Sequence, residues 1–338
     1  MRKFGIHIGF VLLSLCSFGQ DIHFSQYAEL PMNLNPALAG NSSSSKRAGL
    51  IYRNQWNSVT SPFQSSGFFG DMNVNPSFLN GSKIGIGLLF LNDRSGSGGL
   101  QQNHLLAAIN YQRFINKKQT LLISIGPKIG FFQKSYDPTK LNFESDFAYE
   151  SASFISNGSF ENGSNSSVTA LDFGIGTTIT QFNKKGQESI LGISLSHITE
   201  PNQGFVGNSP LPMLISFHAS TVKSINKVLR VKPSVLYMRQ RDFETTVLGG
   251  QFIYNLGRRL VEDTELKAGV YYRSFDALFF TFGINHDNWG INFAYDYNIS
   301  GLQQAAPNVN AFEIAITIKN KIFKSKSRRF ILPGNRLL

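Results

Sequence analysis

The apolar residues of this chain recur at every second position through much of its length. The stretch from 311 to 319 (AFEIAITIK) places Phe312, Ile314, Ile316 and Ile318 on one face, with smaller or charged residues between them. The stretch from 170 to 181 (ALDFGIGTTITQ) alternates in the same way. A period of two that persists this long predicts β-strands rather than helices.

About fourteen segments of this kind can be traced, and most are about ten residues long, which is enough to cross an outer membrane at a tilt. We expect strands near residues 47–56, 63–73, 83–93, 102–114, 120–134, 168–181, 188–198, 213–223, 229–239, 243–255, 264–274, 277–285, 289–299 and 310–319. After residue 20, no apolar run approaches the ~18 residues that a transmembrane helix needs.

Two architectures accommodate such strands, a soluble β-sandwich and a closed transmembrane barrel. The less apolar face consists mostly of Gly, Ser, Ala, Thr and Asn, and small residues suit the interior of a closed barrel. Charged residues make up 16% of the chain, against ~25% in ordinary soluble domains. We therefore predict an all-β protein, a single transmembrane antiparallel β-barrel of about 14 strands.

The connections between the expected strands fall into two classes. Those after even-numbered strands are mostly short and basic, as at 116–118 and 183–186, whereas those after odd-numbered strands include the two longest, 136–167 and 199–212. Outer-membrane barrels have short turns in the periplasm and longer loops outside. The first strand is therefore expected to run outward from the periplasmic side.

The first nineteen residues resemble an export signal. Arg2 and Lys3 precede an apolar stretch from 4 to 18, and small residues precede a cleavage point between Gly19 and Gln20. We predict a cleaved signal peptide at 1–19 and an outer-membrane location in a Gram-negative cell. A helical anchor and a lipoprotein signal ending at Cys16 are the alternatives, but the residue before Cys16 is Leu15 rather than a small one.

Residues 20–46 have neither helical nor alternating periodicity, although they are rich in apolar side chains. Two prolines exclude a continuous helix or central strand, and irregular backbone at membrane depth is tolerated only where protein surrounds it. We predict that this segment is a plug, or hatch, in the barrel lumen; a flexible linker is the alternative. Its candidate lumen residues are Phe24, Gln26, Tyr27, Asn33, Asn35 and Pro36, with the two asparagines expected to satisfy neighbouring backbone groups.

Several ionisable residues fall on the inward face of the expected strands: Arg47, Arg53, Lys267, Arg273, Asp296 and Glu313. A charge that faced lipid at mid-depth would cost about 2–4 kcal/mol, so the lumen is where these side chains are expected. They could pair with one another and hold the barrel in register. A more specific hypothesis is that Arg53 and Arg273 donate to backbone carbonyls of the plug.

The sequence offers little for catalysis or for a cofactor. Its histidines outside the signal are not spaced with carboxylates as metal ligands would be. His197 has Ser194, Ser196 and Glu200 nearby, but alternation would place Ser196 and His197 on opposite faces, and no G-x-S-x-G motif is present. The Gly-rich stretch 95–99 reads as a hairpin turn. We therefore expect no enzyme activity, no cofactor and no bound metal.

The formal net charge of +11 would also suit a nucleic-acid-binding protein. An exported chain rarely meets nucleic acid, so lipopolysaccharide phosphates of the outer membrane or an acidic partner are the expected counterparts.

Six motifs resemble, in order, the PorP/SprF family of type IX secretion system outer-membrane proteins. They are FSQYAELPMNLNPALAG at 24–40, YRNQW at 52–56, LSHITEP at 195–201, GVYYRSFDA at 269–277, YDYNISGL at 295–302 and FEIAI at 312–316. The tripeptide at 35–37 also resembles the N-terminal hatch of fatty-acid-transporter-type barrels. Residues 47–319 would then form the barrel, and residues 320–338 a basic tail in place of an aromatic strand end.

The resemblance implies a non-enzymatic barrel that supports secretion and surface attachment of a large adhesin, bound through the adhesin's C-terminal domain, as in gliding bacteria. It also implies periplasmic partners among the type IX secretion components. The alternative is an outer-membrane channel for small hydrophobic solutes, and an outer-membrane enzyme is a third possibility.

Overall fold

A computed structural model of the chain describes residues 21–42, 44–55, 62–79, 81–96, 99–137, 147–148, 153–154, 166–183, 187–257, 264–300 and 310–320. The predicted signal peptide and the tail beyond Asn320 lie outside the described residues, as does most of the long connection between 136 and 167.

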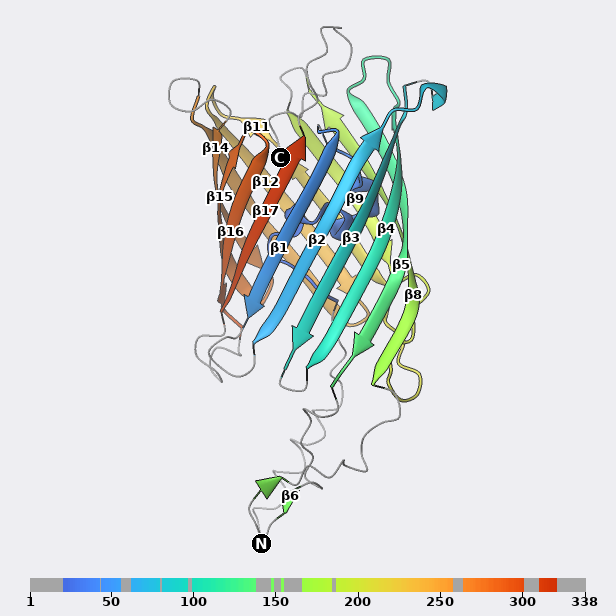
Figure 1. Cartoon of the computed structure of the whole chain (residues 1–338). Coiled ribbons are helices and arrows are strands. Elements are labelled where there is room, and N and C mark those ends of the chain that lie inside the picture. Colours follow the sequence, from blue (N-terminus) through green and yellow to red (C-terminus); the bar gives the residue numbers. More distant parts are fainter. Residues whose placement is uncertain are drawn as a thin grey trace.

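Fourteen long antiparallel strands form a closed barrel (Figure 1). They are β1 (Lys46–Gln55), β2 (Phe63–Val74), β3 (Lys83–Ser95), β4 (Leu100–Phe114), β5 (Leu121–Ser135), β8 (Ser167–Phe182), β9 (Glu188–Ser196), β10 (Leu214–Thr221), β12 (Leu229–Gln240), β13 (Phe243–Asn255), β14 (Thr264–Arg273), β15 (Ala277–His286), β16 (Trp289–Asn298) and β17 (Ala311–Asn320). Each pairs with the next, and β1 pairs with β17 along its whole length, from Lys46 opposite Asn320 to Gln55 opposite Ala311. The predicted fold, a closed antiparallel barrel of about 14 strands, is confirmed.

Three short strands lie outside this set. β11 (Lys223–Ser224) continues the line of β10 along β12, and β6 (Phe147–Ala148) pairs only with β7 (Ser153–Phe154). Short helices occur in the N-terminal segment, η2 (Tyr27–Glu29), α2 (Pro31–Leu34) and η3 (Pro36–Leu38), and η4 (Ser77–Leu79) lies between β2 and β3. In the described part of the chain, no helix has both the length and the apolar character needed to cross a bilayer.

The two faces of the barrel wall differ as the alternation requires. In β16, Phe293, Tyr295 and Tyr297 are exposed on the outer face, while Ala294 and Asp296 are buried on the inner face. Exposed Leu, Ile and Phe side chains recur around the wall on β2, β3, β4, β5 and β8. A wall that is apolar outside and small or polar inside is the arrangement that lipid requires of a spanning barrel.

The two rims of the barrel also differ. β1 begins and β17 ends at one rim, which we call the terminal rim, and it is uppermost in Figure 1. The opposite rim, the loop rim, carries the two longest connections, between β5 and β8 and between β9 and β10. This distribution matches the outer-membrane pattern, in which the rim with short turns faces the periplasm.

Candidate functional site: the N-terminal segment in the lumen

Residues 21–45, which we call the N-terminal segment, run through the lumen from the loop rim to the terminal rim. At one end, the backbone N–H of Asp21 donates to Oε1 of Gln240 (3.2 Å), the last residue of β12. At the other end, the N–H of Asn73, near the end of β2, donates to the carbonyl of Ser45 (3.0 Å). Figure 1 shows the short helices of this segment inside the wall of strands.

The segment supplies much of the apolar core. Its side chains Ile22, Phe24, Leu30 and Met32 are buried in one cluster with inward side chains of β1 to β4 and β17. Burying Leu, Met and Phe side chains contributes roughly 1.5–3 kcal/mol each. This packing explains why a stretch without strand or helix periodicity is nevertheless rich in large apolar residues.

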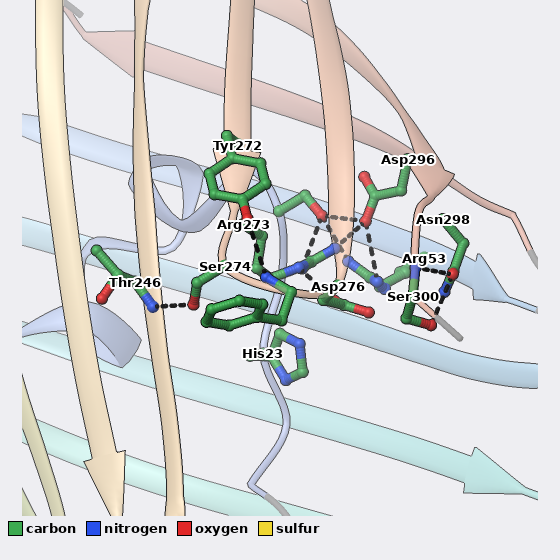
Figure 2. A network of polar contacts seen from close by, with 12 residues as sticks. His23, Arg53, Thr246, Tyr272, Arg273, Ser274, Asp276, Asp296, Asn298 and Ser300 are labelled. Carbon is green, nitrogen blue, oxygen red and sulfur yellow. Dashed lines mark hydrogen bonds and ion pairs between the residues drawn. The ribbon is translucent and has the colours of Figure 1, made fainter. Parts of the chain in front are cut away.

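A buried ionic network fixes the segment at Ser25. Arg53 Nη1 donates to Glu313 Oε1 (2.5 Å) and to the Ser25 hydroxyl (2.7 Å), and Arg53 Nη2 donates to Asp296 Oδ2 (3.1 Å). Arg273 Nη2 donates to the same Asp296 oxygen (2.5 Å). Four of the predicted inward charges therefore meet in one network, from strands β1, β14, β16 and β17, and Figure 2 shows Arg53 and Arg273 converging on Asp296.

The segment's own polar atoms complete the coordination of the two carboxylates. The backbone N–H groups of Ser25 and Gln26 donate to the two oxygens of Glu313 (2.7 and 2.9 Å), and the Ser25 hydroxyl donates to Asp296 (2.6 Å). Charged groups can be buried when ion pairs and hydrogen bonds surround them. The network needs the N-terminal segment, because without it Glu313 would lose two backbone donors.

The partners of the arginines differ from the expectation. Arg53 and Arg273 bond the Ser25 hydroxyl and carboxylates rather than backbone carbonyls of the segment. A backbone carbonyl is instead reached by Arg47, whose Nη2 donates to the Leu38 oxygen (3.2 Å) while its guanidinium pairs with Asp71. Two carboxylates on adjacent inward faces of β16 and β17 are stronger acceptors than a carbonyl, so they take the two guanidinium groups.

Asn35 anchors the middle of the segment. Its side-chain oxygen accepts from Ala37 N–H (2.9 Å) and caps η3, and its Nδ2 donates to the carbonyls of Thr177 and Ile193 (3.1 Å each). The facing positions in β8 and β9 are Gly176 and Gly192; an added Cβ would collide with the Asn35 amide at Gly176 and chiefly with the His218 ring at Gly192. A strand glycine here allows the close approach of a second backbone.

The remaining candidate residues have distinct surroundings. Pro36 begins η3 and is buried; Phe24 and Gln26 are buried; and the Tyr27 hydroxyl donates to Ser234 (3.1 Å). Asn33 lines a small cavity beside Leu236 and Phe243. The backbone-satisfying role expected of Asn33 is performed by Asn110 on β4, whose Nδ2 donates to the carbonyls of Ala37 (2.6 Å) and Ala39 (3.0 Å).

A second ionic group at the loop rim was not foreseen from the sequence. His197 lies between two carboxylates, with Nε2 3.0 Å from Asp21 Oδ2 and Nδ1 3.0 Å from Asp172 Oδ1. Ser196 and His197 are both buried, although alternation would separate them, because β9 ends at Ser196 and His197 turns to a left-handed φ of 56°. The one signal for this ionic group in the sequence was Asp172, a lone carboxylate among the small residues on the inward face of its strand.

The electrostatics of this group favour a charged pair. Burial lowers the pKa of His197, but the carboxylates of Asp21 and Asp172 outweigh burial and raise that pKa to about 9. Burial raises the pKa of Asp21, but His197 and, more weakly, Lys128 hold it well below its usual range. At neutral pH an imidazolium therefore ties the start of the segment to β8.

Comparison with family models gives a match to the type IX secretion system membrane protein PorP/SprF model over residues 16–318. This chain belongs to the PorP/SprF family. The match spans nearly all of the barrel as well as the N-terminal segment, and the resemblance seen in the sequence motifs is thereby confirmed.

Solved structures share the fold at low sequence identity. The Ralstonia pickettii toluene transporter TbuX is 12% identical, with a TM-score of 0.52 over 90% of this chain and 96% of that one. A TodX deltaS2S3 mutant monoaromatic hydrocarbon channel is 11% identical, with a TM-score of 0.51 over 89% of this chain and 95% of that one. The search of curated proteins found no match. The PorP/SprF chain thus has the architecture of outer-membrane barrels.

Replacing Arg53 by Met should destabilise the barrel by about 3–5 kcal/mol, because the buried carboxylates of Asp296 and Glu313 lose a shared cation. The measurement is urea unfolding of the protein refolded in lipid vesicles. Arg239→Met is the matched control, since Arg239 is exposed, and it should change stability by less than about 0.5 kcal/mol. Equal effects of the two substitutions would contradict the structural role of the network.

The contribution of His197 to the free energy of unfolding should depend on pH. Its pKa rises from 6.5 to about 9 on folding, so its stabilising effect is complete below pH 6.5 and is lost as the pH rises through about 9. The difference in unfolding free energy between the wild type and His197→Gln should therefore be largest in mildly acidic buffer and shrink toward alkaline pH. A difference that stays constant across this range would show that the imidazolium does not hold the segment.

Proposed function

We propose that this protein is a non-enzymatic outer-membrane barrel that supports secretion and surface attachment of a large adhesin of the gliding type. Membership of the PorP/SprF family places the chain in type IX secretion. The observation that carries the proposal is the occupied lumen, in which the N-terminal segment is buried and bonded at Asp21, Ser25, Asn35 and Ser45. A filled lumen favours a partner that docks on the barrel over one that passes through it.

The domain organisation follows from the same proposal. A signal peptide at 1–19 is removed on export, residues 20–46 act as the plug, residues 47–319 form the barrel, and the basic tail at 320–338 lies in the periplasm. The rim with short basic turns would contact type IX secretion components there, and the positive charge would also favour lipopolysaccharide phosphates.

The loop rim is the proposed docking surface for the adhesin's C-terminal domain. Two large apolar side chains stand out of it, Phe275 (89% exposed) in the β14–β15 turn and Val206 (80% exposed) in the β9–β10 connection. The long connection from 136 to 167 belongs to the same rim and would add further contacts, either loop packing or strand addition. Apolar contact with these side chains would add to the binding of a docked domain.

Substitution of Phe275 and Val206 together by Ser should reduce co-purification of the adhesin with the barrel after extraction in mild detergent. The matched control is Phe78→Ser, since Phe78 is also strongly exposed (77%) but lies between β2 and β3 at the terminal rim. Quantitative mass spectrometry of the captured complex gives the readout. If no large surface protein co-purifies with the wild type, or if all variants capture it equally, the proposed attachment is refuted.

A channel for small hydrophobic solutes is the second candidate. It is favoured by the likeness of the fold to proteins described as a toluene transporter and a hydrocarbon channel, and by the apolar side chains that the segment carries into the lumen. In that case the plug would move aside or open a lateral path.

Deletion of residues 22–40 separates the two candidates and tests the plug. The deleted barrel should conduct ions in planar bilayers and lose stability, because the segment fills the lumen and supplies donors to Glu313. Point variants in the loop rim serve as the control, since they leave the lumen filled. Unchanged conductance and unchanged stability would show that the segment is not a plug, and loss of uptake of apolar compounds in a strain lacking the gene would favour the channel.

A further inference from the structure

A cavity of about 180 Å³ lies between the N-terminal segment and the barrel wall, where residues of β9, β10, β12 to β17 and β1 line most of it. It occupies the half of the lumen nearer the terminal rim, since Phe182 at the end of β8, Glu188 at the start of β9 and Lys319 near the end of β17 all line it. The four residues of the arginine network, Arg53, Arg273, Asp296 and Glu313, are not among its described lining residues. Ser25 and Gln26, which bond that network, do line the cavity, so it adjoins the anchor of the segment but is bounded by other wall residues.

Three lysines line this cavity, Lys232 on β12, Lys267 on β14 and Lys319 on β17. Within the described residues, none of their ammonium groups has a carboxylate oxygen within 4.0 Å. The other lining cation, Arg47, is already paired with Asp71. The lysines therefore present positive charge to the cavity rather than to a neighbouring side chain.

The carboxylates around the cavity only partly balance this charge. Glu265 is paired with Arg230 (2.5 Å), and Glu29 accepts a hydrogen bond from Thr317 (3.1 Å), which leaves Glu29 and Glu188 as the lining carboxylates without an arginine partner among the described residues. Three lysines therefore face two such carboxylates around the cavity.

Two residues on β15, Thr281 and Asn285, also line the cavity. Thr281 Oγ1 and Asn285 Nδ2 have no hydrogen-bond partner among the described residues, but almost none of their surface is accessible, so these two atoms do not face the cavity.

The strand register brings these groups together. Lys267 lies opposite Gly283, which separates Thr281 from Asn285 on the inner face of β15. Lys232 lies opposite Gln251, which also lines the cavity. Ammonium, hydroxyl and amide donors therefore lie on neighbouring inward positions of β12 to β15.

We propose that this cavity binds a small oxyanion, a solute carrying a carboxylate or phosphate group, that enters from the terminal rim. Lys232 and Lys267 supply the charge and donate to the anion oxygens. A hydrocarbon in the same place would leave these ammonium groups unpaired, which is costly in a buried site. The proposal goes beyond adhesin attachment and does not depend on it.

The test is isothermal titration of the full-length protein in non-ionic detergent with inorganic phosphate and, separately, with succinate. Saturable binding of at least one of them is expected, and Lys267→Gln should weaken it about tenfold or more, since a hydrogen bond to a charged group contributes about 1.5–3 kcal/mol. Lys232→Gln, which removes the second ammonium group, should weaken binding in the same direction. Lys118→Gln is the control, because Lys118 is exposed in the β4–β5 turn at the same rim.

Each outcome decides the matter. Binding of phosphate alone assigns a phosphate group, and binding of succinate alone assigns a carboxylate; either supports the site when Lys267→Gln or Lys232→Gln weakens it and Lys118→Gln does not. Heat-modified migration on gels verifies that each variant is folded, and Lys267→Arg, which keeps the charge, should retain binding. The proposal is overturned if neither anion binds saturably, or if the folded Lys232→Gln and Lys267→Gln variants bind like the control.

Discussion

In lipid, every backbone N–H and C=O must find a partner within the protein, and this requirement governs the whole structure. The ladder between β1 and β17 closes the barrel and removes the two edges that an open sheet would expose. Closure in turn creates a lumen, and a lumen must be filled by side chains, by water or by another segment. Here the chain fills much of it with residues that precede the first strand.

The irregular backbone of the N-terminal segment raises the same requirement inside the barrel. Its carbonyls at Leu38, Ala37 and Ala39 are met by Arg47 and Asn110, and its N–H groups at Ser25 and Gln26 are met by Glu313. The wall therefore has to carry polar groups at these positions, although their neighbours are small or apolar. The buried charges of the wall and the N-terminal segment depend on each other. Without the segment, the carboxylates would lose hydrogen-bond donors, and without the wall's polar groups, the segment's backbone groups would be buried and unpaired.

The sequence predicted the parts that depend on local periodicity. The alternation at 311–319 and 170–181 gave strands within a residue or two of β17 and β8, and the parity of Arg53, Arg273, Asp296 and Glu313 placed all four on the inner face. Contacts that depend on the path of an irregular segment could not be predicted in the same way. The pairing of His197 with Asp21 and Asp172 joins three distant points of the chain and requires the turn that follows β9. The role of Ser25 likewise depends on the point at which the segment crosses β16 and β17. No periodicity in the sequence encodes that point.

Amide hydrogen exchange at Ser25 and Gln26 in lipid nanodiscs tests most directly whether the segment is held by the barrel's buried carboxylates. If Glu313 accepts both N–H groups, these amides should exchange as slowly as those of β16 and β17, since they would open only when the barrel does. Exchange at the rate of an unstructured peptide, while the strands stay protected, would contradict the central role of this interaction.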